Sequence, residues 1–296
     1  MSSAPQPLVL LSEPERDAAE PGLAAEALLQ EVCALSPTQW AHIRQHRQAH
    51  DSTPEAAALA LGLIRPEEAL QVQAWQQRHA HWQVAAQRPH ADWVMRTQPQ
   101  GPQAEAFRRV RSHYLLHVRQ RGGRRPLAVV SPDVQDGRSF FCANLAASLA
   151  QLDGRVLLID ANLRRPRLHE VLAVSDHTGL SDVLAGRHHR RVVQAAPGWA
   201  QLFVVPVGPT PPNPAELIES PTFARLLQEA NERFDHVLVD TPACAMGMDA
   251  IVTAARCGSA LIVSRCGANK TSDLQDLSAA LKAAQVDTVG VVLNDH

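Results

Sequence analysis

The sequence predicts an α/β fold, with a mostly parallel sheet covered by helices on both faces and preceded by a small helical domain. After residue 126, short apolar segments alternate with segments of helical periodicity, which is typical of a buried parallel sheet. Before residue 86, apolar side chains recur at helical spacing instead. The predicted strands are 127–131, 155–161, 202–208, 236–242, 259–266 and 288–294.

Composition limits the classes of protein that the chain can represent. Its 296 residues correspond to about two domains, and 45% of them are hydrophobic, as in globular proteins. The formal net charge of −2 excludes a uniformly basic nucleic-acid coat protein. No apolar run approaches the ~18 residues of a membrane span, and the acidic start of the chain does not resemble a signal peptide. The five cysteines lack Cys-x-x-Cys spacing, so we expect a cytosolic protein without a disulfide framework or a zinc site.

Local composition divides the chain into four segments. Residues 1–22 are rich in Pro, Ser, Ala and Glu and are predicted to form a flexible leader. Residues 23–85 carry the periodicity of a small helical domain. Residues 86–103 are rich in Pro and Gln, which is typical of a linker. Residues 104–296 then form the predicted α/β domain.

The turn after the first predicted strand carries the first chemical signal. It runs from Ser131 to Ser139 and leads directly into a helix, whose first N–H groups favour an anion. Gly137 and Ser139 fit a phosphate-binding loop, which also needs a Lys for the phosphates. Arg138 stands where that Lys is expected, and Gln135 stands where a Gly is expected. By itself the turn fits either a nucleotide-binding loop or a plain strand-to-helix connection.

Two aspartates at the ends of predicted strands favour the nucleotide-binding loop. Asp160 ends one strand and Asp240 ends another. A carboxylate at the tip of a buried strand is costly unless it is paired, hydrated or near a cation. One alternative is that each aspartate caps the turn that follows it. If both strand ends and the loop meet at one Mg²⁺-nucleotide site, that site explains why each of the two strands ends in an aspartate.

These motifs resemble the bacterial tyrosine kinases, or BY-kinases, of exopolysaccharide and capsule synthesis. The loop SPDVQDGRSF resembles that family's Ser-Pro-x-x-Gly-Glu-Gly-Lys-Ser-Thr, and residues 144–172 are similar to its Walker A′ region. Residues 234–243, FDHVLVDTPA, are similar to its Walker B motif, with Asp249 following. The resemblance covers about residues 104–294 and implies a P-loop NTPase-like sheet. Two other family landmarks are matched by GLSDVLAG (179–186) and VGPTPPNPAELIES (207–220).

The resemblance implies an ATP-dependent protein-tyrosine kinase with ATP and Mg²⁺ as cofactors. The implied catalytic positions are Asp160, Asn162, Arg164 and Asp240. The implied cofactor-binding positions are Gly137, Arg138, Ser139 and Phe140. The implied magnesium ligands are Ser139, Asp160 and Asp240. Glu105, Arg108 and Arg111 match the Glu-x-x-Arg-x-x-Arg motif that the family uses for ring-like self-association, so the resemblance also implies a homo-oligomer.

Departures from the family pattern predict that kinase activity is weakened or lost. Arg138 places a wide planar guanidinium where the family has the compact ammonium of a Lys. Asn162 places an amide, which cannot take a proton, where the family has a carboxylate. Gln135 and Phe140 depart from the loop pattern as well. Phosphoryl transfer depends chiefly on the charge placed around the γ-phosphate. One alternative is an active kinase in which Arg138 substitutes for the Lys. Another is a positioning ATPase of the chromosome-partitioning or septum-site type, against which Asp133 counts because that class has a second Lys there.

The sequence also carries predictions about partners and location. Tyr114, the one tyrosine, is expected to be a packing residue, so tail autophosphorylation is not expected. Arginines 108, 109, 111, 119, 121, 124 and 125 form a basic run with few aromatic residues, which favours an anionic membrane surface over nucleic acid; a solvated helix face is the alternative. By resemblance we expect a cytoplasmic protein at the inner face of the cell membrane. It would regulate chain length or export with a membrane-bound polysaccharide chain-length regulator.

Overall fold

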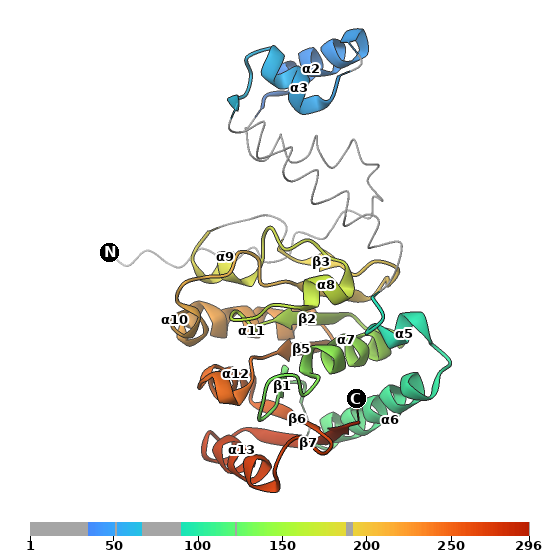
Figure 1. The fold of residues 1–296 in the computed structure, drawn as a ribbon, viewed down its shortest axis with the longest axis vertical. Helices are drawn as coiled ribbons and strands as arrows, with labels where there is room; N and C mark the ends of the chain where they lie inside the picture. The colour runs from blue at the N-terminus through green and yellow to red at the C-terminus, as the bar shows by residue number, and fades with distance from the viewer. Residues whose placement is uncertain (1–34, 51, 67–89, 122, 188–191, 296) are drawn as a thin grey trace. The chain divides into compact units, whose positions relative to one another are not determined.

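The computed structural model shows two compact units (Figure 1). The described residues of the first unit lie within Glu15–Gln87, and those of the second lie within Arg88–His296. The predicted leader, residues 1–22, lies outside the described part, and the predicted helical domain, residues 23–85, is described only in part. The structure describes residues 35–50, 52–66, 90–121, 123–187 and 192–295.

The described part of the first unit contains two helices. Helix α2 spans Pro37–His50 and helix α3 spans Pro54–Ala60. Thr53 caps α3, because its hydroxyl accepts a hydrogen bond from the N–H of Ala56 at 3.4 Å. Both helices lie within residues 23–85, and the small helical domain as a whole stays a prediction. A small core unites Leu35, Trp40, Ile43, Ala57, Ala58 and Ile64.

The second unit is built on a seven-stranded sheet in the order β3-β4-β2-β5-β1-β6-β7. All neighbouring strands are parallel except β3 and β4. Strands β1 and β2 are buried along their whole length, which explains their continuous apolar sequences. The predicted mostly parallel sheet is confirmed. The strands are β1 Leu127–Val130, β2 Val156–Asp160, β3 Gln194–Ala195, β4 Leu202–Val205, β5 His236–Asp240, β6 Ser259–Arg265 and β7 Asp287–Asn294.

Helices cover both faces of this sheet (Figure 1). One core cluster joins the sheet to α5 through α8, and the other joins its opposite face to α9 through α13. The α/β fold class is therefore confirmed. The helices are α5 Val94–Thr97, α6 Pro102–Gln120, α7 Arg138–Leu149, α8 Leu168–Leu172, α9 Leu180–Leu184, α10 Pro214–Glu219, α11 Pro221–Arg233, α12 Asp249–Cys257 and α13 Thr271–Ala283, with a 3₁₀ turn at Cys244–Met246.

Part of the predicted linker, residues 86–103, belongs to the second unit. Its helix α5 follows Trp93, and the side chains of Trp93 and Met95 are fully buried. Three apolar residues in succession, Trp93 to Met95, are enough to dock this short segment on the sheet domain. The Pro and Gln content of the surrounding residues does not reveal such a short apolar run.

The two outermost strands of the sheet differ. Strand β3 has two residues and pairs antiparallel with β4. Strand β7 has eight residues and pairs with β6 on its inner side. On β7 the side chains of Val291 and Leu293 are 53% and 65% exposed. The sheet therefore has a very short strand at one end and a long, partly apolar strand at the other.

Candidate functional site

The two predicted aspartates lie side by side at the ends of neighbouring strands. Strand β2 pairs with β5 in a register that places Asp160 opposite Asp240, and both side chains are fully buried. Asp160 Oδ1 accepts a hydrogen bond from the N–H of Asn162 (3.0 Å), and its Oδ2 accepts one from the N–H of Leu168 (3.2 Å). The hydroxyl of Ser139 donates to Asp240 Oδ2. The structure thus brings the first helical turn of α7 and both strand tips together.

Burial raises the pKa of both carboxyl groups. The pKa of Asp240 rises to about 6 because burial disfavours its charge, against the opposing influence of Arg138 and the Ser139 hydroxyl. Burial raises the pKa of Asp160 well above its usual range, and the neighbouring charge of Asp240 raises it further. Burial also raises the pKa of the Cys142 thiol, whose Sγ lies 3.8 Å from Asp240 Oδ1. Both carboxyl groups therefore release their protons at a higher pH than ordinary aspartates, and a nearby cation would favour their charged forms.

The oxygen atoms of this site fit a magnesium ion. Mg²⁺ in proteins is commonly held by one or two carboxylates, while waters and phosphates supply its other ligands. Ser139, Asp160 and Asp240 place two carboxyl groups and a hydroxyl in one location. Among the residues that the structure describes, no group of three or more His, Cys, Asp or Glu side chains could hold a metal. A cation here would therefore depend on ligands from water or phosphate.

The raised pKa of Asp240 predicts a pH dependence of stability. Its pKa is about 6 in the fold against an ordinary 3.8, so the folded state binds the proton more tightly. This stabilisation is complete below the ordinary pKa and is lost as the pH rises through about 6. In EDTA, we expect the free energy of unfolding to fall by about 2 kcal/mol between about pH 4 and about pH 7 through this group.

Asp240→Asn should remove most of this dependence of the free energy of unfolding on pH, because the amide does not titrate and no longer raises the pKa of Asp160. Urea denaturation at a series of pH values measures the effect, with Asp153→Asn, an exposed position, as the control. Equal slopes for the native chain and Asp240→Asn would contradict the prediction.

The side chain of Arg138 forms hydrogen bonds with the phosphate loop itself. Its side chain is buried, and its Nε donates a hydrogen bond to the carbonyl oxygen of Thr241 at 3.0 Å. Its Nη1 donates to the carbonyl oxygen of Asp133 at 2.6 Å and to the hydroxyl of Ser131. The guanidinium is thus held by oxygen atoms of the protein on both sides of the loop.

Carboxylates of the loop bind its own backbone N–H groups. Asp136 Oδ2 accepts a hydrogen bond from the N–H of Asp133 at 2.8 Å, and Asp133 Oδ1 accepts one from the N–H of Val134 at 2.7 Å. Asp136 is buried and also accepts from Nδ2 of Asn269 at 3.3 Å. In a phosphate-binding loop, backbone N–H groups surround the phosphates. Two of them here are already paired with acidic side chains.

The loop keeps a left-handed backbone at two positions. Gly137 has a φ of 93°, and a β-carbon there would lie 2.2 Å from Nδ2 of Asn294. Asn294 itself donates to the carbonyl oxygen of Asp136 at 3.1 Å, so strand β7 supports the loop. Gln135 has a φ of 62°, a conformation that costs a residue with a side chain about 1 kcal/mol. The loop therefore retains a glycine-like shape at Gln135.

Asn162 and Arg164 hold the turn that follows β2. Asn162 Nδ2 donates to the carbonyl oxygen of Arg165 at 2.7 Å, and its Oδ1 accepts from the N–H of Arg165 at 3.2 Å. Arg164 forms a two-point ion pair with Asp249, with Nε–Oδ2 at 2.7 Å and Nη2–Oδ1 at 3.2 Å. This pair raises the pKa of Arg164. Both polar atoms of the Asn162 amide are used within the turn, and Arg164 joins it to α12.

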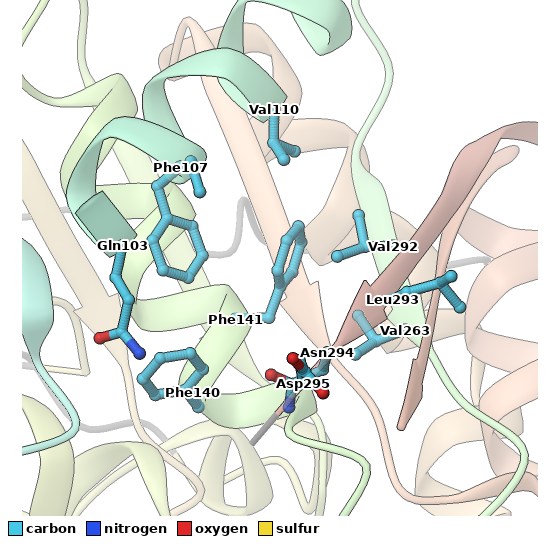
Figure 2. Close-up of a pocket in the computed structure, with 11 residues that line it drawn as sticks. Gln103, Phe107, Val110, Phe140, Phe141, Val263, Val292, Leu293, Asn294 and Asp295 are labelled. Carbon is cyan, nitrogen blue, oxygen red and sulfur yellow. The ribbon is translucent and has the colours of Figure 1, made fainter. Parts of the chain in front are cut away.

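Phe140 lines a cavity of about 350 Å³ beside the loop. Its ring centroid lies 5.7 Å from that of Phe107, and Phe141 lies at the same distance from Phe107. Figure 2 shows these rings on α6 and α7, with Asn294 and Asp295 at the end of β7. Phe140 therefore adds an aromatic wall next to the loop, whereas Ser139 contacts Asp240.

The predicted oligomerisation residues share helix α6. Glu105 and Arg108 form an ion pair at 3.1 Å, and Arg111 Nη1 donates to the carbonyl oxygen of Ser148 at 2.6 Å. All three line a groove of about 280 Å³ together with Arg109, Ser112 and His113. They lie on one helix, as their spacing requires, and assembly through them stays a prediction.

Acidic side chains offset part of the basic run. Arg121 pairs with Asp287 at 3.0 Å, and Arg124 pairs with Asp235. The charge available for an anionic membrane is therefore smaller than the sequence suggests, and that contact stays a prediction. Tyr114 is 3% exposed, and burial raises its pKa to about 12. It is a packing residue, as expected.

Sequence reasoning missed the groups that hold Arg138 and the loop. Thr241 and Asp133 accept hydrogen bonds from Arg138 through their backbone carbonyl oxygens. Every residue has such an oxygen, so the sequence gives no signal for these contacts. Asp136 does leave a signal, because an acidic side chain inside a phosphate-binding loop is unexpected and needs a partner. Asn294 comes from the last strand, far along the chain from the loop.

Comparison with known proteins gives relatives for the second unit. No family model matches the chain. The chain is 36% identical over 168 residues to the tyrosine-protein kinase wzc of Salmonella typhimurium, which is 57% of this chain and 23% of that protein. The chain spans about a quarter of the length of the curated relatives that it matches.

Solved structures show the same fold. The kinase domain of the Escherichia coli tyrosine kinase ETK is similar with a TM-score of 0.64 and 33% identity, over 70% of this chain and 82% of that domain. The septum site-determining protein MinD of Pyrococcus horikoshii, solved with Mg-ADP, has a TM-score of 0.50 and 24% identity, over 57% of this chain and 70% of that one. The second similarity shows the fold alone. In the described ranges, no helix is both long and apolar enough to cross a bilayer.

Proposed function

The chain belongs to the bacterial tyrosine kinase family, and from this premise we propose that it serves exopolysaccharide synthesis with its tyrosine kinase activity weakened or lost. In this proposal it regulates the length or export of the polymer together with a membrane-bound chain-length regulator. It acts at the cytoplasmic face of the cell membrane and assembles with copies of itself through Glu105, Arg108 and Arg111. In this proposal the site binds ATP and Mg²⁺ only weakly and no longer transfers phosphate efficiently.

The position of Arg138 is the observation that carries this proposal. Its Nε and Nη1 donate to oxygen atoms of Ser131, Asp133 and Thr241, so these two nitrogens are already engaged within the protein. Hydrogen bonds from a charged group contribute about 1.5–3 kcal/mol each, so a phosphate would have to replace several of them. A Lys at this position has one compact charge on a flexible stem and could reach a phosphate.

The carboxylates of the loop support the same conclusion. Asp133 and Asp136 each accept a hydrogen bond from a loop N–H group. A triphosphate would compete with these negative side chains for the same donors and would be repelled by them. The phosphate loop as it stands does not fit a tightly bound triphosphate, although the neighbouring carboxyl pair fits Mg²⁺.

One observation favours the alternative of an active kinase. The Ser139 hydroxyl still contacts Asp240, and Asp160 lies opposite Asp240 in the sheet. The groups that would hold the magnesium ion are therefore assembled, whereas the altered positions are those of the phosphate contacts and of Asn162. The third hypothesis, a positioning ATPase, has support from the fold alone.

A nucleotide titration tests the proposal. We expect the native chain, residues 1–296, to show no saturable binding of a fluorescent ATP analogue with Mg²⁺ at micromolar concentrations. Arg138→Lys combined with Asn162→Asp should bind at least about thirtyfold more tightly, which corresponds to ~2 kcal/mol. Arg165→Lys, an exposed change of the same kind, is the matched control and should leave binding unchanged.

Phosphoryl transfer is measured in parallel with radiolabelled ATP and a Glu-Tyr copolymer as acceptor. Micromolar binding by the native chain together with labelling of the copolymer would overturn the loss of activity and support the active kinase. In a polymer-producing strain that lacks this chain, the native gene should restore polymer length, and a failure to do so would contradict the regulatory role.

A further inference from the structure

Residues 90–97, here called the docking segment, are the first described residues of the second unit, whose range starts at Arg88. Trp93 is fully buried within it and stacks on Trp199 with ring centroids 6.2 Å apart. Arg96 lies 5.2 Å from the centroid of the Trp93 ring. The path of the chain from the first unit into the sheet domain thus runs through a packed segment.

Asn144 on α7 joins the docking segment to the start of that helix. Its side chain is fully buried, and its Oδ1 accepts a hydrogen bond from the N–H of Met95 at 2.9 Å. Its Nδ2 donates to the carbonyl oxygens of Asp92 at 2.7 Å and Phe140 at 2.8 Å. Phe140 directly follows Ser139 at the end of the phosphate loop. One amide side chain therefore holds both the segment and the first turn of the helix.

A second contact reaches the other half of the site. Asp92 pairs with Arg167, with Oδ2 and Nη2 2.9 Å apart. The N–H of Arg167 in turn donates to Asp160 Oδ2 at 3.4 Å. The docking segment thus contacts the phosphate-loop helix through Asn144 and the turn after β2 through Arg167.

We propose that docking of residues 90–97 sets the order of the phosphate loop and of the turn after β2. Undocking would leave the buried amide of Asn144 without two of its three partners and would release Arg167. Such coupling is reciprocal, so whatever orders the loop also favours docking. The proposed coupling lies within the second unit and requires neither kinase activity nor nucleotide binding.

Hydrogen–deuterium exchange of the full chain tests the proposal without any ligand. Asp92→Arg places two positive charges together and should speed exchange about fivefold in peptides covering residues 90–97. The same variant should speed exchange in peptides covering 138–144 and 160–168. Arg167→Asp should have a similar effect, and the double variant, in which the charges are exchanged, should return all three regions toward the native rates.

Asn144→Asp is a second, independent variant. It keeps the acceptor for Met95 but removes both donated hydrogen bonds, so exchange in the same three regions should rise about tenfold. Asp92 is partly exposed, so its variants carry the test if Asn144→Asp does not fold. Asp153→Arg, an exposed charge reversal just beyond the other end of α7, is the control.

Two results would overturn the proposal. If Asp92→Arg speeds exchange only in residues 90–97, docking of the segment does not set the order of the phosphate loop or of the turn after β2. Unchanged exchange in residues 90–97 themselves would show that the contact with Arg167 does not control docking.

Discussion

Arg164→Ala is expected to lower the free energy of unfolding by about 3 kcal/mol. Arg164 forms a two-point ion pair with Asp249, whose side chain is 6% exposed. Removal of the arginine leaves a buried carboxylate without its partner, which is more damaging than loss of a surface pair. The position of Asp249 in the first turn of α12 offsets part of this loss, because helix N-termini favour negative charge.

Urea denaturation of the full chain measures this effect, and two variants sharpen it. Arg164→Ala combined with Asp249→Ala should recover about half of the lost stability, because no unpaired charge remains. Arg165→Ala, at the next position but exposed, should change stability by less than about 0.5 kcal/mol. A loss below about 1 kcal/mol in Arg164→Ala would show that the ion pair does not stabilise the turn.

Trp93→Ala should destabilise the second unit by about 3–5 kcal/mol. The Trp93 side chain has no exposed surface, packs on Trp199 and lies beneath the guanidinium of Arg96. Its removal leaves a cavity that the short helix α5 cannot close. Trp93→Phe keeps an aromatic ring and should lose less than half as much.

Leu152→Ala, at a position that is 40% exposed, is the control for Trp93→Ala and should have an effect within about 0.5 kcal/mol. The loss is measured by urea denaturation followed by far-ultraviolet circular dichroism. If Trp93→Ala were as stable as the control, the docking segment would have to be only loosely packed.

The buried strands were the most predictable part of the fold. Strands such as β1 and β2 are covered on both faces, so their sequences are continuously apolar and stand out from the helices between them. Strand β3 could not be predicted, because two antiparallel residues leave no periodic pattern. Helix α5 was hidden for a similar reason, since one turn of helix within a segment rich in Pro and Gln has too few residues for periodicity.

The location of the site was predictable, but the geometry within it was not. Asp160 and Asp240 end parallel strands, and the ends of such strands meet at one edge of the sheet. The direction of the Arg138 side chain depends on backbone carbonyl oxygens and therefore on the complete fold. Likewise, the sequence identifies Asn162 as a departure from the family pattern. Its two hydrogen bonds with Arg165 could not be predicted, because they depend on the conformation of the local turn.

The unequal ends of the sheet limit how copies of this chain could polymerise. The outer margin of β7 offers eight residues, with Val291 and Leu293 exposed, to an incoming strand. The opposite margin is the two-residue β3, which is too short to receive another β7. Among the described strands, backbone pairing of two copies is consequently limited to β7 against β7, a twofold pair that uses up both long margins and does not propagate into a fibre.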